Sequence, residues 1–435
     1  MPSLGELSIV WATPMKIMNQ NILRCTPLAV AGLVLFAVES RSGDWPQWRG
    51  PDRTDLSEEK GLLGSWPDGG PKRAWLYAQA GKGYSGPAIV GGKLLIMGSE
   101  VVEGKEMEVM MALDAEKGGK LWSAPLTPLF DNRWGHGSRG TPSVEGGMVY
   151  GMTGNGTLVC VQLADGKEVW RVSMTEDLGG EVPGWGYTES VLVDEGRVIC
   201  TPGGSKGTMA ALEAKTGKVL WRSGGFTEGA QYASPIVVTH GGVRQYVQLT
   251  MKVLAGVDAK DGKLLWQSDW PGRTAVIPTP IERDGYVYIT SGYGVGCKLV
   301  KLGGAMPEDV YQNREMKNHH GGVILLGDYV YGHSDGVDWV CQNFKTGEVK
   351  WTSDKLGKGA IGYADGHFYC VDEGSGTVVL IEASPEGWNE KGRFTLDPQS
   401  SIRERSGRIW THPVISNGRL YLRDQEYIYC FDVRG

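Results

Sequence analysis

The sequence lacks blocks of basic residues, long apolar runs and closely spaced cysteines. Its 435 residues contain 44 Lys and Arg against 50 Asp and Glu, so no nucleic-acid partner is expected. The apolar run over residues 27–38 is shorter than the roughly 20 residues that span a bilayer, so no transmembrane helix is expected in the mature chain. No two of the seven cysteines have the spacing of metal ligands, which argues against metal binding by cysteine.

The N-terminal region has the layout of a targeting signal. Lys16 and Arg24 precede the apolar run, and the polar stretch 39–42 follows it. A basic segment, a short apolar segment and a polar segment in this order are typical of a signal peptide. We therefore interpret residues 1–42 as a signal peptide or targeting segment and expect a periplasmic or secreted protein.

Glycine and tryptophan are abundant, and one segment recurs. The 66 Gly and 16 Trp indicate many tight turns around an aromatic core. Segments of equal length that each end on Trp lie at 112–122, 160–170, 211–221, 256–266 and 341–351. Each carries a small residue, a polar residue, a glycine turn and the final Trp, which predicts a β-hairpin. A second hairpin precedes each copy, and four strands make one propeller blade.

The spacing of the tryptophans predicts the number of blades. Intervals of 45 to 51 residues separate the tryptophans at positions 75, 122, 170, 221 and 266. Trp351 follows Trp266 after 85 residues, so one blade has lost its Trp, and residues 310–316 are expected to form its outer strand. With two further units at 359–394 and 410–435, we predict an all-β, eight-bladed propeller of four-stranded antiparallel blades.

The two ends of the chain are expected to close the ring. The last unit stops before its outer strand, whereas residues 74–77 read as an outer strand with no blade of their own. We therefore predict that strand 74–77 completes the last blade, which leaves no long open edge. The propeller then spans 74–435, and residues 43–73 form a Trp- and Pro-rich N-terminal extension that packs on it.

The repeat resembles a known type. The pattern Ala-x-Asp-x-x-Thr-Gly-x-x-x-Trp is similar to the pyrroloquinoline-quinone (PQQ) repeat of quinoprotein dehydrogenases and of the outer-membrane β-barrel assembly lipoprotein. Four motifs resemble exported Planctomycete PQQ-repeat proteins that are often labelled polyvinyl-alcohol dehydrogenase: Trp45-Pro-Gln-Trp-Arg-Gly-Pro51, Trp134-Gly-His-Gly137, Asn318-His-His-Gly321 and Trp410-Thr-His-Pro413. The resemblance implies the propeller fold and leaves the activity open, because one fold hosts unrelated functions.

The sequence departs from the enzymes of this type. It has neither the adjacent Cys-Cys pair of the large quinoprotein alcohol dehydrogenases nor the Cys-x-x-Cys-His haem site of polyvinyl-alcohol dehydrogenases. We therefore interpret the protein as a scaffold that binds a protein partner or a small polar, sugar-like ligand. The alternative is a dehydrogenase for alcohols or sugars that holds PQQ and Ca²⁺, with Glu189 or Asp335 as general base.

The cysteines of the propeller fit the repeat register. Cys160, Cys341 and Cys430 fall at the small position of the hairpin, and Cys200 and Cys370 fall at a shared position of a preceding strand. This register favours small, buried and inert side chains. Disulfides between neighbouring blades are the alternative.

Candidate site residues lie in the loops at one mouth of the channel. In a propeller, the segments that enter each blade and the loops between its second and third strands emerge on the same face. The ligand-binding candidates there are His136, Arg139, Trp185, Tyr187, Glu189, Tyr232, Tyr293, His319, His320, Trp410 and His412. Their rings and polar groups predict a pocket for a planar or sugar-like ligand. Polar capping of the loop backbone is the alternative.

A metal site is less favoured at this mouth. His319 and His320 are adjacent, and neighbouring residues of an extended chain point to opposite sides. A metal site would therefore need His136, His412 or Glu189 from across the channel.

Overall fold

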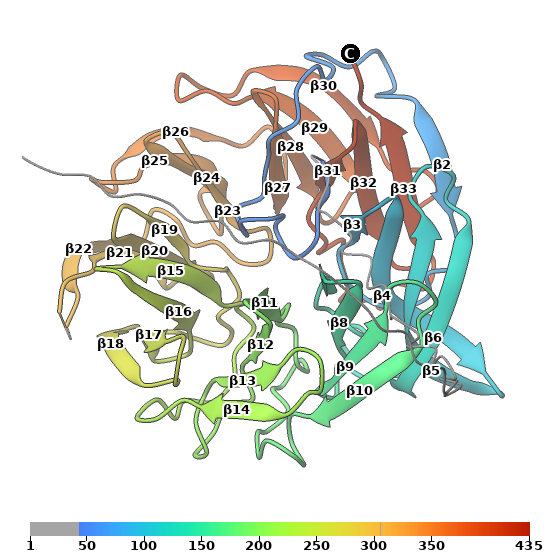
Figure 1. Ribbon diagram of the computed structural model, residues 1–435. Helices are drawn as coiled ribbons and strands as arrows, with labels where there is room; N and C mark the ends of the chain where they lie inside the picture. The colour runs from blue at the N-terminus through green and yellow to red at the C-terminus, as the bar shows by residue number, and fades with distance from the viewer. Residues whose placement is uncertain (1–42, 305) are drawn as a thin grey trace, which may run out of the picture. The chain divides into compact units, whose positions relative to one another are not determined.

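The computed structural model describes residues 43–304 and 306–435, and the predicted targeting segment 1–42 lies outside them. Eight β-sheets follow one another around a ring (Figure 1). Each blade consists of four antiparallel strands, which confirms the predicted eight-bladed propeller. In the part of the chain that is described, no helix is long and apolar enough to cross a membrane.

The first four blades use consecutive strands, ordered from the channel outward. Blade 1 contains β3 (Ala88–Val90), β4 (Lys93–Val102), β5 (Lys105–Asp114) and β6 (Lys120–Pro128). Blade 2 contains β7 (Ser143–Glu145), β8 (Met148–Met152), β9 (Thr157–Gln162) and β10 (Glu168–Ser173). Blade 3 contains β11 (Leu192–Asp194), β12 (Arg197–Cys200), β13 (Ala210–Glu213) and β14 (Val219–Arg222). Blade 4 contains β15 (Ile236–His240), β16 (Val243–Leu249), β17 (Val253–Asp258) and β18 (Leu264–Asp269).

The next three blades repeat this order. Blade 5 contains β19 (Ile281–Arg283), β20 (Tyr286–Ser291), β21 (Gly296–Lys301) and β22 (Glu308–Asn313). Blade 6 contains β23 (Val323–Leu326), β24 (Tyr329–Ser334), β25 (Asp338–Asn343) and β26 (Val349–Ser353). Blade 7 contains β27 (Gly359–Ala364), β28 (His367–Asp372), β29 (Thr377–Glu382) and β30 (Glu390–Thr395).

Blade 8 joins the two ends of the chain. It contains β31 (Val414–Ser416), β32 (Arg419–Asp424) and β33 (Tyr427–Asp432) from the C-terminus and β2 (Arg73–Tyr77) from the N-terminal side. Strands β2 and β33 pair antiparallel, with Trp75 opposite Cys430. The predicted closure of the ring is therefore confirmed.

The recurring Trp ties each blade to the next. Trp170 lies opposite Cys160 in its own blade, and its Nε1–H donates a hydrogen bond to the carbonyl of Ala214 in blade 3 at 2.9 Å. Gly217 turns the following hairpin with φ +73°, and a Cβ there would lie 2.8 Å from the Trp170 ring. The motif thus needs glycine both for the left-handed backbone and for close approach to the tryptophan of the previous blade.

The spacing of the tryptophans predicted one blade without the Trp, but blades 5 and 7 both lack it, and each is completed differently. In blade 5, Tyr311 takes its place opposite Leu299, and its hydroxyl donates to the carbonyl of Phe344 in blade 6 at 2.9 Å. In blade 7, Gly392 occupies the position, and a Cβ there would lie 2.6 Å from Cβ of Trp66. Trp66, from the N-terminal extension, is buried at this point of the blade.

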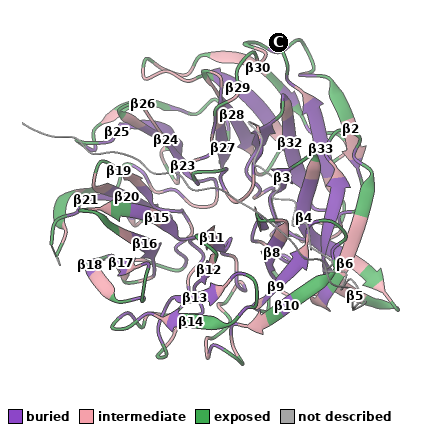
Figure 2. Ribbon diagram, in the orientation of Figure 1, coloured by how far each residue is buried: buried purple, intermediate pink, exposed green. Residues whose placement is uncertain are grey.

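The hydrophobic core is divided among the blade interfaces. Eight clusters of buried side chains each join two neighbouring blades, and Figure 2 shows the buried residues along the strands inside the sheets. All six cysteines of the described propeller are buried and free, and the register had predicted burial for five of them, all but Cys297. The interfaces depend on this apolar packing and on the Trp hydrogen bonds.

The N-terminal segment 43–57 occupies the channel of the propeller. Its backbone and side chains contact an innermost strand, or the residues directly before one, in all eight blades: Ile89, Val144, Val191, Pro235, Thr279, Val323, Tyr363 and His412. Arg53 is buried and donates to the carbonyls of Ser190, Val191 and Pro235 at 2.6–3.0 Å. Strand β1 (Leu56–Ser57) then pairs parallel with β27. The extension is therefore part of the folded ring.

Candidate functional site

A pocket of about 480 Å³ lies at the mouth where chain segments enter the blades. The entering segments of seven blades contribute to its lining, together with loops between second and third strands. Trp48 and Arg49 of the channel segment also line it. Since segment 43–57 contacts every blade, the pocket is closed on the channel side by the protein's own chain.

Aromatic rings form much of the pocket wall. The ring of Trp410 stacks on His320, with centroids 4.7 Å apart and planes 25° apart, and it contacts Tyr84 at 4.8 Å. Trp185 and Tyr232 meet edge to face at 5.6 Å in the same lining. Such rings offer flat apolar faces to a ligand.

The adjacent histidines His319 and His320 lie at the pocket with their rings 3.7 Å apart. Lys358 Nζ lies 2.6 Å from His319 Nδ1 and 2.9 Å from a carboxylate oxygen of Asp335. Burial lowers the pKa of both histidines, that of His320 to about 3, so both rings are neutral at pH 7. Because an ammonium group only donates, His319 Nδ1 accepts and its proton sits on Nε2.

His412 connects the pocket to the channel segment. Its Nδ1 lies 3.0 Å from Asp55 Oδ2, and its Nε2 lies 2.9 Å from the carbonyl oxygen of His320. Asp55 also pairs with Arg49 Nε at 2.7 Å, and both side chains are buried. The channel segment therefore fixes one side of the pocket.

Charge in the lining is mostly positive. Arg139 donates to the carbonyls of Gly135 and Gly137 at 2.6–2.7 Å, and Arg408 donates to the carbonyl of Gly407 at 2.8 Å. Among the described residues, neither guanidinium has an ion-pair partner. Glu373 is the one acidic residue of the lining, and burial raises the pKa of its carboxyl to about 7.

The structure brings together eight of the eleven ligand-binding candidates. The lining contains Arg139, Trp185, Tyr232, Tyr293, His319, His320, Trp410 and His412. Asp335 lies just behind it, held by Lys358. The predicted mouth is therefore the place where these side chains meet.

Tyr187 and Glu189 lie outside the lining, and their predicted placement is corrected. Both side chains are buried, and Glu189 accepts a hydrogen bond from the Thr201 backbone at 2.6 Å. The alternate residues Thr188 and Ser190 line the pocket instead. Side chains of an extended segment point alternately to opposite sides, and the prediction took the wrong side. Burial raises the pKa of Glu189 to about 7.

His136 also lies outside the lining. Its Nε2 is 2.8 Å from Glu404, and its Nδ1 is 3.0 Å from Asp131. It thus links the segment that enters blade 2 to the segment that enters blade 8. These segments carry Arg139 and Trp410, so His136 supports the pocket from behind.

Several lining residues were not predicted: Trp48, Arg49, Tyr84, Trp134, Glu373 and Arg408. Trp48 and Arg49 belong to the motif Trp45-Pro-Gln-Trp-Arg-Gly-Pro51, but nothing in the repeat register places that motif in the channel. Glu373 directly follows β28 in blade 7, just as Asp335 directly follows β24 in blade 6. An alignment of the blades with one another could therefore have predicted Glu373.

The residues do not form a metal centre. Within 43–304 and 306–435, no group of three or more His, Cys, Asp or Glu side chains could hold a metal ion. Calcium takes six to eight oxygen ligands, and Glu373 supplies the one carboxylate of the lining. The donor set therefore does not fit a calcium site.

The fold and the pocket define an eight-bladed propeller with a blind cavity over a filled channel. The chain belongs to the PQQ-repeat family described as outer membrane protein assembly factor BamB, whose sequence pattern matches residues 105–378. No curated protein sequence matches the chain.

Solved structures share the fold at low sequence identity. BamB from Moraxella catarrhalis is 16% identical, with a TM-score of 0.55 over 80% of this chain and 94% of that one. The quinohemoprotein alcohol dehydrogenase from Comamonas testosteroni is 14% identical, with a TM-score of 0.60 over 94% and 83%. That from Pseudomonas putida HK5 is 13% identical, with a TM-score of 0.61 over 91% and 81%. Assembly factors and enzymes thus share this architecture, so the function rests on the site.

Proposed function

We propose that this protein is an exported binding propeller that holds a small, ring-shaped polar ligand in the pocket over its channel. The observation that carries the proposal is the make-up of the lining, in which aromatic rings lie beside the hydroxyl groups of Ser190 and Ser234 and the guanidinium groups of Arg139 and Arg408. A concave, mostly apolar site with a few convergent polar groups is typical of a small-ligand pocket.

The size and walls of the pocket support a small ligand rather than a protein partner. A volume of about 480 Å³ lies in the range of small-molecule sites. The stacked pair His320 and Trp410 on one wall and the pair Trp185 and Tyr232 on another provide faces for a ring. A protein partner would need a larger apolar surface than this cavity offers.

The alternative function, a PQQ- and Ca²⁺-dependent dehydrogenase, has less support. The residues do not make a calcium site, as described above. Of the two acids expected to act as its base, Glu189 lies outside the pocket and Asp335 is paired with Lys358. We therefore assign binding to the pocket and derive no redox step.

Export and kinship with the exported Planctomycete repeat proteins are part of the same proposal. Export is supported by the signal-like pattern of residues 1–42. The kinship is supported by the motif at 45–51, two of whose residues, Trp48 and Arg49, line the pocket.

Calorimetric titration of the purified protein tests the proposal. The panel contains D-glucose, D-galactose, D-glucuronate, and PQQ with and without CaCl₂, each measured against the wild type and Trp410→Ala. We expect one panel member to bind at one site per chain and to bind at least tenfold more weakly to Trp410→Ala. Absence of binding across the panel, or dye reduction with PQQ and CaCl₂, would overturn the proposal.

A further inference from the structure

The pocket offers hydroxyl groups as hydrogen-bond donors. Ser190 Oγ accepts from the Thr141 backbone at 2.8 Å, and Ser234 Oγ accepts from the Ser190 backbone at 2.9 Å. Since each hydroxyl accepts from the backbone, its own O–H is free to donate into the cavity.

The same lining carries excess positive charge. Arg139 and Arg408 hydrogen-bond to backbone carbonyls and form no ion pair in the described parts of the chain, although Glu108 acts electrostatically on Arg139 and Arg408 acts on Glu373. Arg49 is neutralised by Asp55. A cavity that holds guanidinium groups without a direct ion pair favours a ligand that bears a carboxylate.

The lining also needs donors from the ligand. The carboxyl of Glu373 lies 3.8 Å from His320 Nδ1, beyond hydrogen-bond distance. An acceptor at this position is satisfied by a hydroxyl group of the ligand. A simple aromatic acid has a carboxylate but no hydroxyl group to donate, whereas a sugar acid has both.

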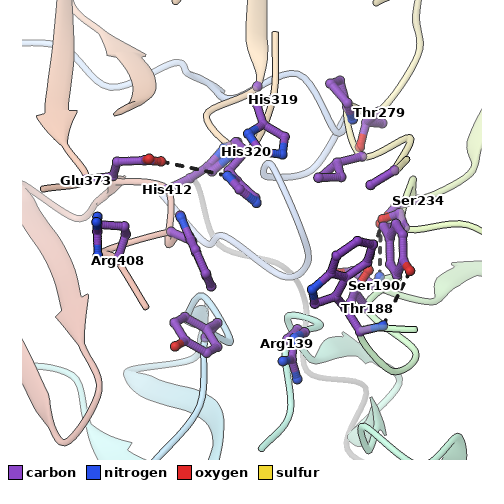
Figure 3. Close-up of a pocket in the computed structure, with 18 of the residues that line it drawn as sticks. Arg139, Thr188, Ser190, Ser234, Thr279, His319, His320, Glu373, Arg408 and His412 are labelled. Atoms are coloured by element: carbon purple, nitrogen blue, oxygen red, sulfur yellow. Dashed lines mark hydrogen bonds and ion pairs between the residues drawn. The ribbon is translucent and has the colours of Figure 1, made fainter. Parts of the chain in front are cut away.

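The polar groups are separated within the pocket. Figure 3 shows Glu373 and Arg408 on one side of the cavity and Thr188, Ser190 and Ser234 on the opposite side. A ring with an acid group at one end and hydroxyl groups around it matches this division. The aromatic wall supplies a face on which such a ring can lie.

We propose that the pocket binds a hexuronate, a six-carbon sugar acid, and that Arg408 provides its preference for the acid over the neutral sugar. This inference rests on the proposed binding function and adds the chemical class of the ligand. The sugar ring lies against Trp410, its hydroxyl groups contact Glu373 and the hydroxyl side chains, and its carboxylate meets the guanidinium group of Arg408.

The test compares D-glucuronate with D-glucose by calorimetric titration at pH 7.5. We expect D-glucuronate to bind the wild type at least tenfold more tightly. Arg408→Gln should reduce that preference to threefold or less, because it removes the positive charge that meets the carboxylate. Arg408 is exposed and bonds only to neighbouring backbone, so the substitution should leave the fold intact. Arg393→Gln is the matched control: Arg393 pairs with Glu390 on the outer strand β30, so its substitution should keep the full preference.

The outcomes separate the inference from the proposed function. Equal affinity for both sugars, or a preference that survives Arg408→Gln, would overturn the hexuronate assignment and leave the binding function standing. No binding of either sugar would overturn the assignment as well, and the binding function would then fail only if PQQ and D-galactose also did not bind.

Discussion

His412 Nδ1 lies 3.0 Å from Oδ2 of the Asp55 carboxylate, although 357 residues separate the two in the sequence. Asp55 belongs to the segment that fills the channel, and His412 lines the pocket. The cavity therefore depends on a part of the chain that contributes a single two-residue strand and no blade of its own. Closing the ring and building the site are carried out by the same N-terminal region.

Removal of the Asp55 carboxylate should destabilise the protein strongly. Asp55→Ala leaves the buried Arg49 guanidinium without its ion-pair partner and His412 Nδ1 without its nearest polar neighbour. Breaking a buried pair from one side typically costs about 3–5 kcal/mol of unfolding free energy, which urea denaturation measures. Glu168→Ala, which removes the exposed pair with Arg171, should cost less than about 1 kcal/mol. Losses of similar size in both variants would contradict the role given to the channel segment.

Glycine at the Trp-facing turn should be needed for two separable reasons. Gly217 and Gly196 have the same φ of +73°, but a Cβ at Gly217 meets the Trp170 ring and one at Gly196 meets nothing within 4 Å. Gly196→Ala should cost about 1–2 kcal/mol from backbone strain alone. Gly217→Ala should cost about 1–3 kcal/mol more, because the ring must move. Thermal unfolding of both variants measures the two losses of stability. Equal losses would show that the Trp170 ring moves aside without a cost in stability.

The stability of the protein should depend on pH through Glu373. Burial raises the pKa of its carboxyl to about 7 from the ordinary value of 4.5, with Asp335 acting in the same direction and Lys358 and Arg408 opposing. The folded state therefore holds this proton more tightly than the unfolded state does. The resulting stabilisation is complete below about pH 4.5 and is lost as the pH rises through about 7.

Glu373→Gln isolates this contribution, because glutamine does not ionise. The unfolding free energy of the variant relative to the wild type should rise by up to about 3 kcal/mol between pH 4.5 and pH 8. Urea denaturation at both pH values measures the change. Glu308→Gln, at an exposed position of β22, serves as the control and should show no such rise. A flat difference for Glu373→Gln would mean that water reaches the carboxyl in the folded state.

Glu189 and Trp410 should respond in opposite ways to substitution. Glu189→Ala removes a buried acceptor from the Thr201 backbone and should cost about 2–4 kcal/mol of stability, with little change in the affinity for D-glucuronate. Trp410→Ala removes a partly exposed ring from the pocket and should weaken binding at least tenfold. Thermal unfolding and titration of both variants test this. Weaker binding by Glu189→Ala would show that Glu189 takes part in ligand binding.

The fold could be predicted because the repeat has a physical meaning at every copy. The small residue, the glycine turn and the Trp each take part in a contact between neighbouring blades. The motif therefore recurs with the blades, and its spacing gives their number. The two blades without Trp were harder, because Tyr311 replaces it within its strand and Trp66 replaces it from outside the repeat. A replacement from outside leaves no trace in the register of the blade.

The site could be predicted in its location and only partly in its membership. Blade topology places the entering segments at one mouth, and that rule led to His319, His320 and Trp410. It does not show which side of an extended segment faces the cavity, and for that reason Glu189 was wrongly predicted to line the pocket. Nor does it show that Trp48 lies in the channel, because that placement depends on contacts with blades far away in sequence.

A crystal structure of the protein soaked with D-glucuronate tests the central claim most directly, because it locates the ligand. We predict one sugar in the pocket, with its ring against Trp410, its carboxylate within hydrogen-bond distance of Arg408, and segment 43–57 still filling the channel beneath it. A sugar bound elsewhere on the propeller, or a pocket that holds only water at a concentration that saturates binding in solution, would contradict the account.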